Sequence, residues 1–502
     1  MYKKCVPWAI SACFAGMFAT VGGCRVGPDY AGPPAACMQT EYRIGTDSAI
    51  QGDWAAVAGW WNGFQDPVLD RLIYRASSQN LDLREAAIRI FEARAQRCTV
   101  RADLWPELRQ DGSYARTQFS QSGGMMGGLG STISDQWSLG LNGTWEIDVF
   151  GRLRRLVEAA DADIAVTIED YRDTLVILLA DVATNYVDAR AYQRRLKISR
   201  ENLALQRRTL ELTEKRFAAE LVGELDVAQA RANAESTAAG IPALEVGYRH
   251  AVNRLSVLVG CPPGEVDPLL ADPAPIPTPP EEIAIGIPAD LLRRRPDIRR
   301  AEQEIAAQTA RIGAAVGEMY PKFSILGSFS LDARDFSRLF AADAIGASVG
   351  PTMQWNILTF GRLRCNVYVQ EARQEQYVVR YQAVVLRAAE EVDNALVSFE
   401  REGQRRVHLA GQVAANRRAV ELSQHRYAGG DVDFQRVLDS QRSLLQAEDL
   451  LASSDAIVAA SLIQLYRALG GGWEQPEEPS AEPPVEQLLP PAEQILTPAP
   501  EN

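Results

Sequence analysis

The feature that most constrains this chain is a proline-free stretch from residue 152 to residue 218 with apolar residues at every seventh position. The heptad positions are Leu175, Val182, Ala189, Leu196, Leu203, Leu210 and Phe217. Sustained heptads predict coiled-coil packing. A helix over this stretch would be about 100 Å long, at about 1.5 Å per residue. No single globule can enclose such a helix, so we expect it to run beside others in a bundle or tube wall.

The chain also repeats itself. The pentapeptide FGRLR occurs at 150–154 and at 360–364, and a tryptophan stands five residues before each copy, at Trp145 and Trp355. The same offset of 210 aligns further residues, and an offset of 215 aligns the preceding segments, including Pro106 with Pro321. Constant offsets over such distances predict a tandem duplication.

The N-terminus has the layout of a secretory signal peptide, with Lys3 and Lys4 followed by an apolar run and small residues. A short transmembrane helix is the alternative, because the run approaches the roughly 20 residues that span a bilayer. The sequence VGGC at 21–24 resembles a bacterial lipobox, in which Cys24 becomes the first mature residue and carries lipid. Arg25 follows instead of aspartate, which by bacterial sorting rules indicates delivery to the outer membrane.

Composition divides the chain into six segments. We expect a signal peptide at 1–23, a lipidated N-terminal segment at 24–65, a first repeat at 66–260, a proline-rich connection at 261–288, a second repeat at 289–471, and an acidic, proline-rich, disordered tail at 472–502.

Within each repeat the expected order is a helix, two strands and a long helix that returns on itself. The first helices are expected at about 66–103 and 289–319, each ending before a proline. The turns at 217–231 and 427–442 are then the tips of two helical hairpins, far from the strands.

Four segments alternate between apolar and small polar residues with a period of two. We expect strands at about 107–119, 136–149, 322–332 and 345–358. This pattern fits a membrane β-barrel with a wet interior as well as a half-buried soluble sheet. Four strands cannot close a barrel, since the smallest membrane barrels have about eight, and lipid does not tolerate open edges. Membrane strands would therefore require several chains to share one barrel.

Other classes of function find little support. The net charge of −13 argues against a nucleic-acid partner. The three histidines lack metal-ligand spacing, and there is no nucleophile elbow or phosphate loop, so we expect no enzyme, no metal and no cofactor. Cys37, Cys98, Cys261 and Cys365 form no CxxC pair, which leaves a disulfide and small buried thiols equally open.

Five stretches together resemble the TolC-like outer-membrane efflux proteins, specifically the lipoprotein branch of RND multidrug efflux systems (NodT-type outer-membrane factors). They are CRVGPDYAGP (24–33), GWWNGFQDPVLDRLI (59–73), IPADLLRRRPDIRRAEQEI (287–305), FGRLR in both copies, and LDSQR (438–442). The resemblance implies a mainly α homotrimer with membrane β-strands. Three chains of four strands would form one twelve-stranded barrel, continuous with a long periplasmic α-helical coiled-coil barrel.

By the same resemblance, the protein would be a passive exit duct for small molecules in the outer membrane. Its partners would be outer-membrane lipid, a periplasmic membrane-fusion adaptor and an inner-membrane RND pump. A type I protein-secretion duct of the same fold and a non-pore periplasmic coiled-coil lipoprotein are the alternatives. Substrate choice is expected in the pump, because tube lumens are generic.

The resemblance also implies roles for individual residues. Asp439 matches the aspartate that lines the family's closed aperture, and Arg442 matches its arginine, although an ordinary surface pair is the alternative for both. Gln435 stands where the family usually has an apolar residue. The adaptor-docking tips would comprise Phe217, Glu220, Gly223, Val227, Tyr427, Gly430 and Val437. The strand-to-helix junctions would be Gly151 with Arg152, and Gly361 with Arg362.

Overall fold

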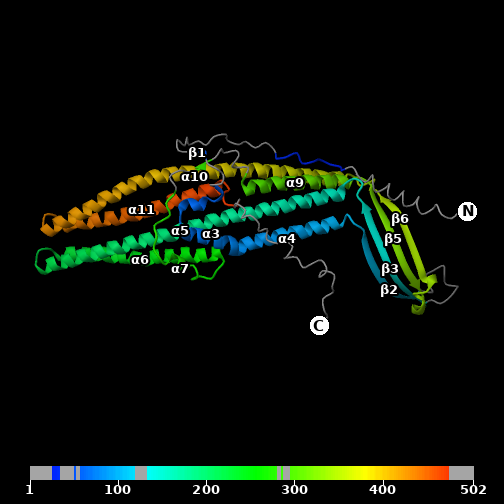
Figure 1. Ribbon diagram of the computed structural model, residues 1–502, viewed down its shortest axis with the longest axis horizontal. Helices are drawn as coiled ribbons and strands as arrows, with labels where there is room; N and C mark the ends of the chain where they lie inside the picture. The colour runs from blue at the N-terminus through cyan, green and yellow to red at the C-terminus, as the bar shows by residue number, and fades with distance from the viewer. Residues whose placement is uncertain are drawn as a thin grey trace. The chain divides into compact units, whose positions relative to one another are not determined.

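The computed structural model describes residues 25–33, 50–51, 57–118, 133–279, 284–285 and 294–473. Its helices are α3 (Pro67–Gln79), α4 (Leu81–Ala102), α5 (Arg152–Ala218), α6 (Glu224–Val259), α7 (Asp267–Leu270), α9 (Pro296–Gly317), α10 (Arg362–Gly429) and α11 (Phe434–Ala468). Its strands are β1 (Ile50–Gln51), β2 (Glu107–Gln118), β3 (Ile133–Ile147), β4 (Ala284–Ile285), β5 (Lys322–Ala333) and β6 (Ile345–Gln354). The prediction of a mainly helical chain with four longer strands is confirmed (Figure 1).

The described residues pack as two compact units, and each unit takes parts of both predicted repeats. The sheet-bearing unit holds the described residues of 25–33, 81–174 and 294–390. The tip-bearing unit holds those of 50–80, 175–285 and 391–473. The long helices α5 and α10 contribute residues to both units.

The predicted heptad helix forms over 67 residues as α5. Its heptad residues Leu175, Val182 and Leu203 are buried. Phe217, the last of the heptad, has 44% of its surface exposed. The apolar stripe therefore supplies a packed core along α5 and reaches solvent only at the hairpin tip.

The expectation of one continuous helix over 66–103 is wrong, because the chain breaks at Asn80. Asn80 ends α3 with an extended ψ of 133°, and its side-chain amide donates a hydrogen bond to the carbonyl oxygen of Leu258 at 2.8 Å. Asparagine competes well for backbone partners outside helices, which favours a helix end here. At the other end, Asp66 accepts hydrogen bonds from the amides of Val68 and Leu69 as an N-cap.

The four long strands form one antiparallel sheet in the order β2-β3-β5-β6 (Figure 1). In the first hairpin Glu107 pairs with Thr144, and in the second Lys322 pairs with Gln354. The first members of these pairs differ by 215 residues and the second members by 210, the two offsets found in the sequence. The two hairpins therefore share one register. The strand predicted to end at 358 ends at Gln354 instead.

Pairing of β3 with β5 gathers most of their apolar residues on one face, with Leu326 as an exception on the other. Leu139 and Leu141 lie opposite Leu331 and Phe329, so the apolar residues of β3 and β5 share one face. Ser138, Asn142 and Thr144 on the other face lie opposite Asp332, Ser328 and Leu326. Among the described residues, no helix combines the length and apolarity needed to cross a bilayer.

Candidate functional site: the junctions and the hairpin tips

The two tryptophans before FGRLR make the same contact in each repeat. The indole nitrogen of Trp145 donates to the carbonyl oxygen of Leu104 at 3.0 Å. That of Trp355 donates to the carbonyl oxygen of Met319 at 3.1 Å. Both acceptors stand two residues before the proline that ends the incoming helix segment. Each indole therefore ties the end of an incoming helix to the point where a strand leaves the sheet.

The glycines of both FGRLR motifs adopt left-handed backbone conformations. Gly151 has a φ of 78° and Gly361 a φ of 85°, and the helices α5 and α10 begin at the next residue. Such angles cost little only for glycine. Arg152 forms an ion pair with Glu146 at 2.9 Å, whereas Arg362 is exposed. The two predicted junctions thus share a left-handed glycine. They differ at the preceding residue, where Phe360 is also left-handed with a φ of 48° and Phe150 is not, and in their side-chain contacts.

The first junction is covered by the residues that follow Cys24, whose own position lies outside the described residues together with Cys37. The amide of Val26 donates to the carbonyl oxygen of Phe150 at 3.2 Å. A Cβ on Gly151 would lie 3.1 Å from the Cα of Arg25. At the second junction a Cβ on Gly361 would meet no atom within 4 Å.

Arg155, which sequence reasoning missed, is completely buried beneath this segment. Its guanidinium donates to the carbonyl oxygens of Val26 at 3.1 Å and Gly27 at 3.2 Å. It also lies 2.8 Å from Asp29, and the guanidinium holds the pKa of that carboxyl below its ordinary value. The available signal was that the motif continues to Arg155 in the first repeat but to Cys365 in the second.

The RRRPDIRR stretch forms ion pairs with the acidic side of α5. Arg299 lies 3.0 Å from Glu169, and Arg300 lies 2.8 Å from Asp170. Burial raises the pKa of Glu169 above its ordinary value, although the nearby guanidinium groups oppose this shift. Burial, and then the charge of Asp297, raise the pKa of Asp173 in the same way. This stretch of the second repeat therefore binds α5 of the first repeat through ion pairs.

The two hairpin tips end their long helices with the same turn. At the first tip Leu221 donates its amide hydrogen to the carbonyl oxygen of Arg216 at 2.9 Å, and at the second Asp431 does the same to Arg426 at 2.9 Å. The residue before each donor is left-handed, with φ of 59° at Glu220 and 84° at Gly430. This is the Schellman arrangement, in which glycine is preferred. Glu220 thus holds a conformation that disfavours its side chain.

The predicted docking residues divide into exposed and buried groups. Phe217, Glu220, Gly223 and Gly430 are exposed, and Val227 is half-buried. Tyr427 and Val437 are buried in a small core with Ala230, Phe434 and Leu438. The guanidinium of Arg216 lies 4.5 Å from the centre of the Tyr427 ring and donates to the Tyr427 carbonyl oxygen. Tyr427 and Val437 therefore hold the two hairpins together, and the exposed group is available to a partner.

The three predicted gate residues do not form one cluster. Gln435 donates a hydrogen bond to a carboxylate oxygen of Asp439 at 2.9 Å, and both side chains are exposed. Arg442 instead donates to the amide oxygen of Asn233 on α6 at 3.0 Å. Arg442 therefore links the second hairpin to the first. Sequence reasoning missed Asn233, because no pattern in the sequence places it opposite Arg442.

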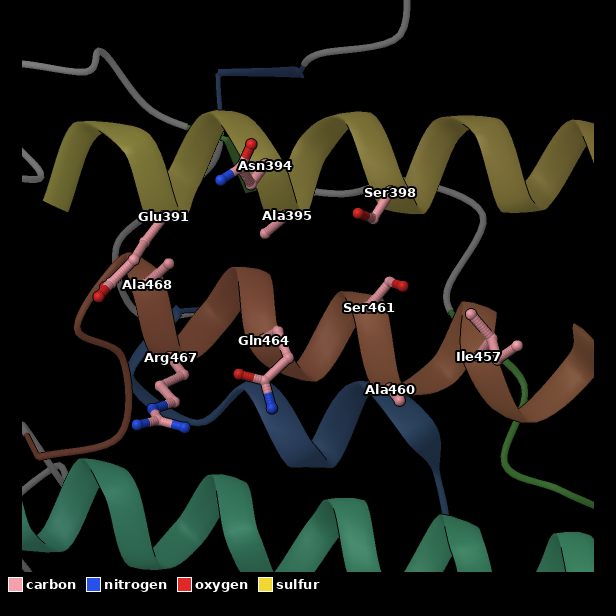
Figure 2. A pocket seen from close by; sticks show the side chains of 10 residues that line it. All are labelled: Glu391, Asn394, Ala395, Ser398, Ile457, Ala460, Ser461, Gln464, Arg467 and Ala468. Atoms are coloured by element: carbon pink, nitrogen blue, oxygen red, sulfur yellow. The ribbon is translucent and has the colours of Figure 1, made fainter. Parts of the chain in front are cut away.

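A further cleft of about 480 Å³ lies between α10 and α11. Figure 2 shows Ser398 and Ser461 directed into the same gap, with Asn394 and Gln464 nearby. No group of three or more metal-ligating side chains occurs in the described parts of the chain. The cysteines within those parts, Cys98, Cys261 and Cys365, are free thiols, and burial raises the pKa of Cys261.

Comparison with known proteins places this chain in one protein family. The model of the outer membrane efflux protein family matches residues 72–261 and 287–471. Nodulation protein T of Rhizobium leguminosarum bv. trifolii is 34% identical over 454 residues, which is 90% of this chain and 95% of that protein. The cation efflux system protein CusC of Escherichia coli is 32% identical, over 90% of this chain and 96% of that protein.

Solved structures agree with these sequence relatives. The outer-membrane channel OprN superposes with a TM-score of 0.80 at 33% identity, over 90% of this chain and all of that chain. A structure of CusC superposes with a TM-score of 0.76 at 28% identity, over 89% of this chain. The described fold is therefore one that outer-membrane channels adopt.

Proposed function

This chain belongs to the outer membrane efflux protein family and is a non-enzymatic outer-membrane channel of a tripartite efflux system, and we propose that it works as a lipid-anchored homotrimer. Three copies of the four-stranded sheet would close a twelve-stranded barrel. The single observation that carries this proposal is the sheet itself, in which β3 and β5 share one mainly apolar and one mainly polar face, and in which the edge strands β2 and β6 have no further strand partner among the described residues. Such edges are not tolerated in lipid, so other copies must cover them.

The lipid anchor would be attached to Cys24. The docked segment that begins at Arg25 supports this, because it holds the chain next to the proposed anchor against the first strand-to-helix junction. The lipid would then lie near the membrane surface, where a strand passes into a periplasmic helix.

The periplasmic adaptor would dock on the hairpin tips and connect the channel to an inner-membrane pump. Phe217 offers an exposed aromatic surface, and Glu220, Gly223 and Gly430 are exposed around the two turns. The buried pair Tyr427 and Val437 would keep the two hairpins in register, without touching the adaptor.

The gate would consist of three copies of Asp439 at the periplasmic aperture. Like charges at one constriction repel or hold a cation. The hydrogen bond from Gln435 supports a fixed position for this carboxylate. Arg442, through Asn233, would couple the position of the second hairpin to that of the first.

The exported compounds would be small molecules. The relatives of this chain are named for cation, toluene and antibiotic efflux at 31–32% identity. These relatives are named for different compounds, yet their sequence identities to this chain are nearly equal. This supports a duct that does not select its substrate, with the choice made by the pump.

Electron microscopy of the detergent-extracted protein tests the assembly, and single-channel conductance tests the gate. We expect three-fold particles, and a larger conductance for Asp439→Ala than for the parent protein. Gln435→Leu should lower conductance, since it restores an apolar side chain at the aperture. Compact monomers or an unclosed rod would refute the homotrimer and its shared barrel, and would favour the coiled-coil tether. If the protein forms closed rings but exports a secreted protein and no small molecule, it is a type I secretion duct.

A further inference from the structure

Two cysteines of the sheet-bearing unit are exposed and unbonded within one chain. Cys98 lies near the end of α4, and Cys365 lies in the first turn of α10. The helices of an outer-membrane efflux protein extend into the periplasm, which is oxidising and favours disulfides. An unpaired thiol in an exported protein points to a reactive group or to a bond between chains. These two cysteines therefore raise the question of a partner.

Each cysteine has an equivalent in the other repeat. The helices α4 and α9 are both 22 residues long, and the offset of 215 that relates them carries Cys98 onto Gly313. The offset of 210 that relates α10 to α5 carries Cys365 onto Arg155. Gly313 and Arg155 are buried, whereas both cysteines are exposed.

Gly313 and Arg155 touch where α9 packs on α5. A Cβ placed on Gly313 would lie 3.0 Å from Cγ and 2.8 Å from Cδ of Arg155. Because Cγ is one bond from Cβ of Arg155, the two Cβ positions fall within the roughly 4.5 Å that a disulfide can span. A pair of cysteines at this place in the fold could therefore be bonded without movement of the helices.

The same place occurs again between neighbouring copies of the homotrimer proposed above. Within one chain α9 lies beside α5, with Arg311 at 2.6 Å from Asp163, and α4 lies on the other side of α5, with Arg97 at 2.7 Å from Asp161. When the β2 edge of one copy meets the β6 edge of the next, α4 comes to lie beside α10 of that copy as α9 lies beside α5. Cys98 then stands where Gly313 does.

We propose that Cys98 of one copy and Cys365 of the next form a disulfide, which closes the homotrimer into a covalent ring at the periplasmic side of the barrel. The proposal rests on the homotrimer proposed above and adds a covalent, redox-sensitive bond at each interface. The bond takes the place that the contact of Gly313 with Arg155 has inside one chain.

The surroundings of Cys365 leave room for such a partner. In the first repeat Arg155 holds the segment after Cys24 through the carbonyl oxygens of Val26 and Gly27. At the second junction Cys365 is exposed, and a Cβ on Gly361 would meet no atom within 4 Å. The exchange of arginine and glycine for two cysteines also replaces one long and one absent side chain by two short ones.

Formation of the bond requires a disulfide oxidant, carried by a periplasmic protein or a small molecule. The thiolate of one cysteine attacks this oxidant, which forms a mixed disulfide and releases one thiol. The thiolate of the other cysteine then attacks the sulfur of the first and releases the second thiol. One S–S bond forms and one breaks, and the two electrons and two protons leave with the reduced oxidant.

Non-reducing denaturing gels of the full-length, membrane-extracted protein test the bond. Oxidised glutathione serves as the oxidant, and an alkylating reagent blocks free thiols before the sample is boiled. We expect covalent dimers and trimers for the parent protein, which dithiothreitol converts to monomers. Cys98→Ser and Cys365→Ser should each lose every covalent oligomer, whereas Cys261→Ser is the matched control and should keep them.

Mass spectrometry identifies the bonded pair without any substitution. Trypsin should release one linked species made of peptides 98–101 and 365–373, because an arginine precedes each cysteine. Its recovery from the covalent dimer band would place the bond between chains. Its recovery from the monomer band alone would place both cysteines in one copy and overturn the proposal.

The remaining outcomes separate the bond from the assembly. Three-fold particles whose chains all run as monomers after oxidation would overturn the disulfide and leave the homotrimer in place. Covalent dimers that persist in Cys98→Ser or in Cys365→Ser would assign the bond to another pair and overturn it as well. Absence of three-fold particles in the parent protein would refute the proposed assembly itself.

Discussion

The buried guanidinium of Arg155 donates a hydrogen bond to the carbonyl oxygen of Val26 at 3.1 Å, which ties the first turn of α5 to the residues that follow Cys24. A segment that could have been a loose tether is thereby part of the packed protein. The second repeat has an exposed cysteine, Cys365, at the equivalent position. The duplication was therefore followed by specialisation of the first junction.

Replacing Arg155 by alanine should release this segment from α5. The change leaves the carbonyl groups of Val26 and Gly27 without their donor, at a cost of about 1 kcal/mol for each lost hydrogen bond. Hydrogen exchange at the Val26 amide, which bonds to Phe150, measures the release. Cys365→Ala is the matched control and should leave exchange unchanged. Equal protection of the Val26 amide in Arg155→Ala and in the parent protein would show that Arg155 does not hold this segment on α5.

The two junction glycines should respond differently to alanine. Gly361→Ala meets only the strain of a positive φ, about 1 kcal/mol. Gly151→Ala meets that strain and also brings its Cβ to 3.1 Å from the Cα of Arg25. We expect a lower midpoint of thermal unfolding and faster proteolysis at Arg25 for Gly151→Ala. Identical behaviour of the two variants would show that the N-terminal segment does not press on Gly151.

Replacing Glu220 by glycine should stabilise the first hairpin tip. Glu220 holds a φ of 59° in a turn that prefers glycine. The equivalent position of the second repeat is already a glycine, Gly430. The expected gain is about 0.5 to 1 kcal/mol. Slower hydrogen exchange at the Leu221 amide measures it. Gly430→Ala is the reciprocal variant and should speed exchange at Asp431; no change in either amide would argue against backbone strain.

The stability of the sheet-bearing unit should depend on the protonation of Asp173. Burial, and then the charge of Asp297, raise its folded pKa above the ordinary value of 3.8, while Arg300 and Arg295 oppose the shift. The folded state therefore binds this proton more tightly than the unfolded chain. The destabilising contribution of Asp173 is present above the folded pKa and fades as the pH falls through it.

Asp173→Asn should accordingly raise the midpoint of thermal unfolding at neutral pH, and the advantage should shrink in mild acid. Asp161→Asn, on the same helix but 50% exposed at its side chain, is the control of opposite sign, because it removes an ion pair with Arg97 and should lower the midpoint at neutral pH. A difference between Asp173→Asn and the parent that stays constant from pH 7 to acid would exclude titration of Asp173 as the cause.

Some features of the fold followed from the sequence with little ambiguity. The heptad of α5, the period of two in the strands and the offsets of 210 and 215 are local or repetitive patterns. They are visible without tertiary structure, because helix and strand periods follow from backbone geometry. The equal register of the two hairpins is the direct consequence of those two offsets.

Other features depend on which residues meet in space. The break at Asn80 depends on the carbonyl of Leu258, 178 residues later. Arg442 donates to Asn233, 209 residues away, and not to Asp439, the neighbour with which its spacing suggested a surface pair.

The sequence by itself determined the repeat, the element types and the family. Only the tertiary structure decided that Arg155 is buried under the segment after Cys24, and that Tyr427 is part of the tip core whereas Phe217 is exposed. The physical reason is that a side chain's burial and partners depend on long-range packing. The two copies of a repeat have the same local pattern, but each is surrounded by different parts of the chain.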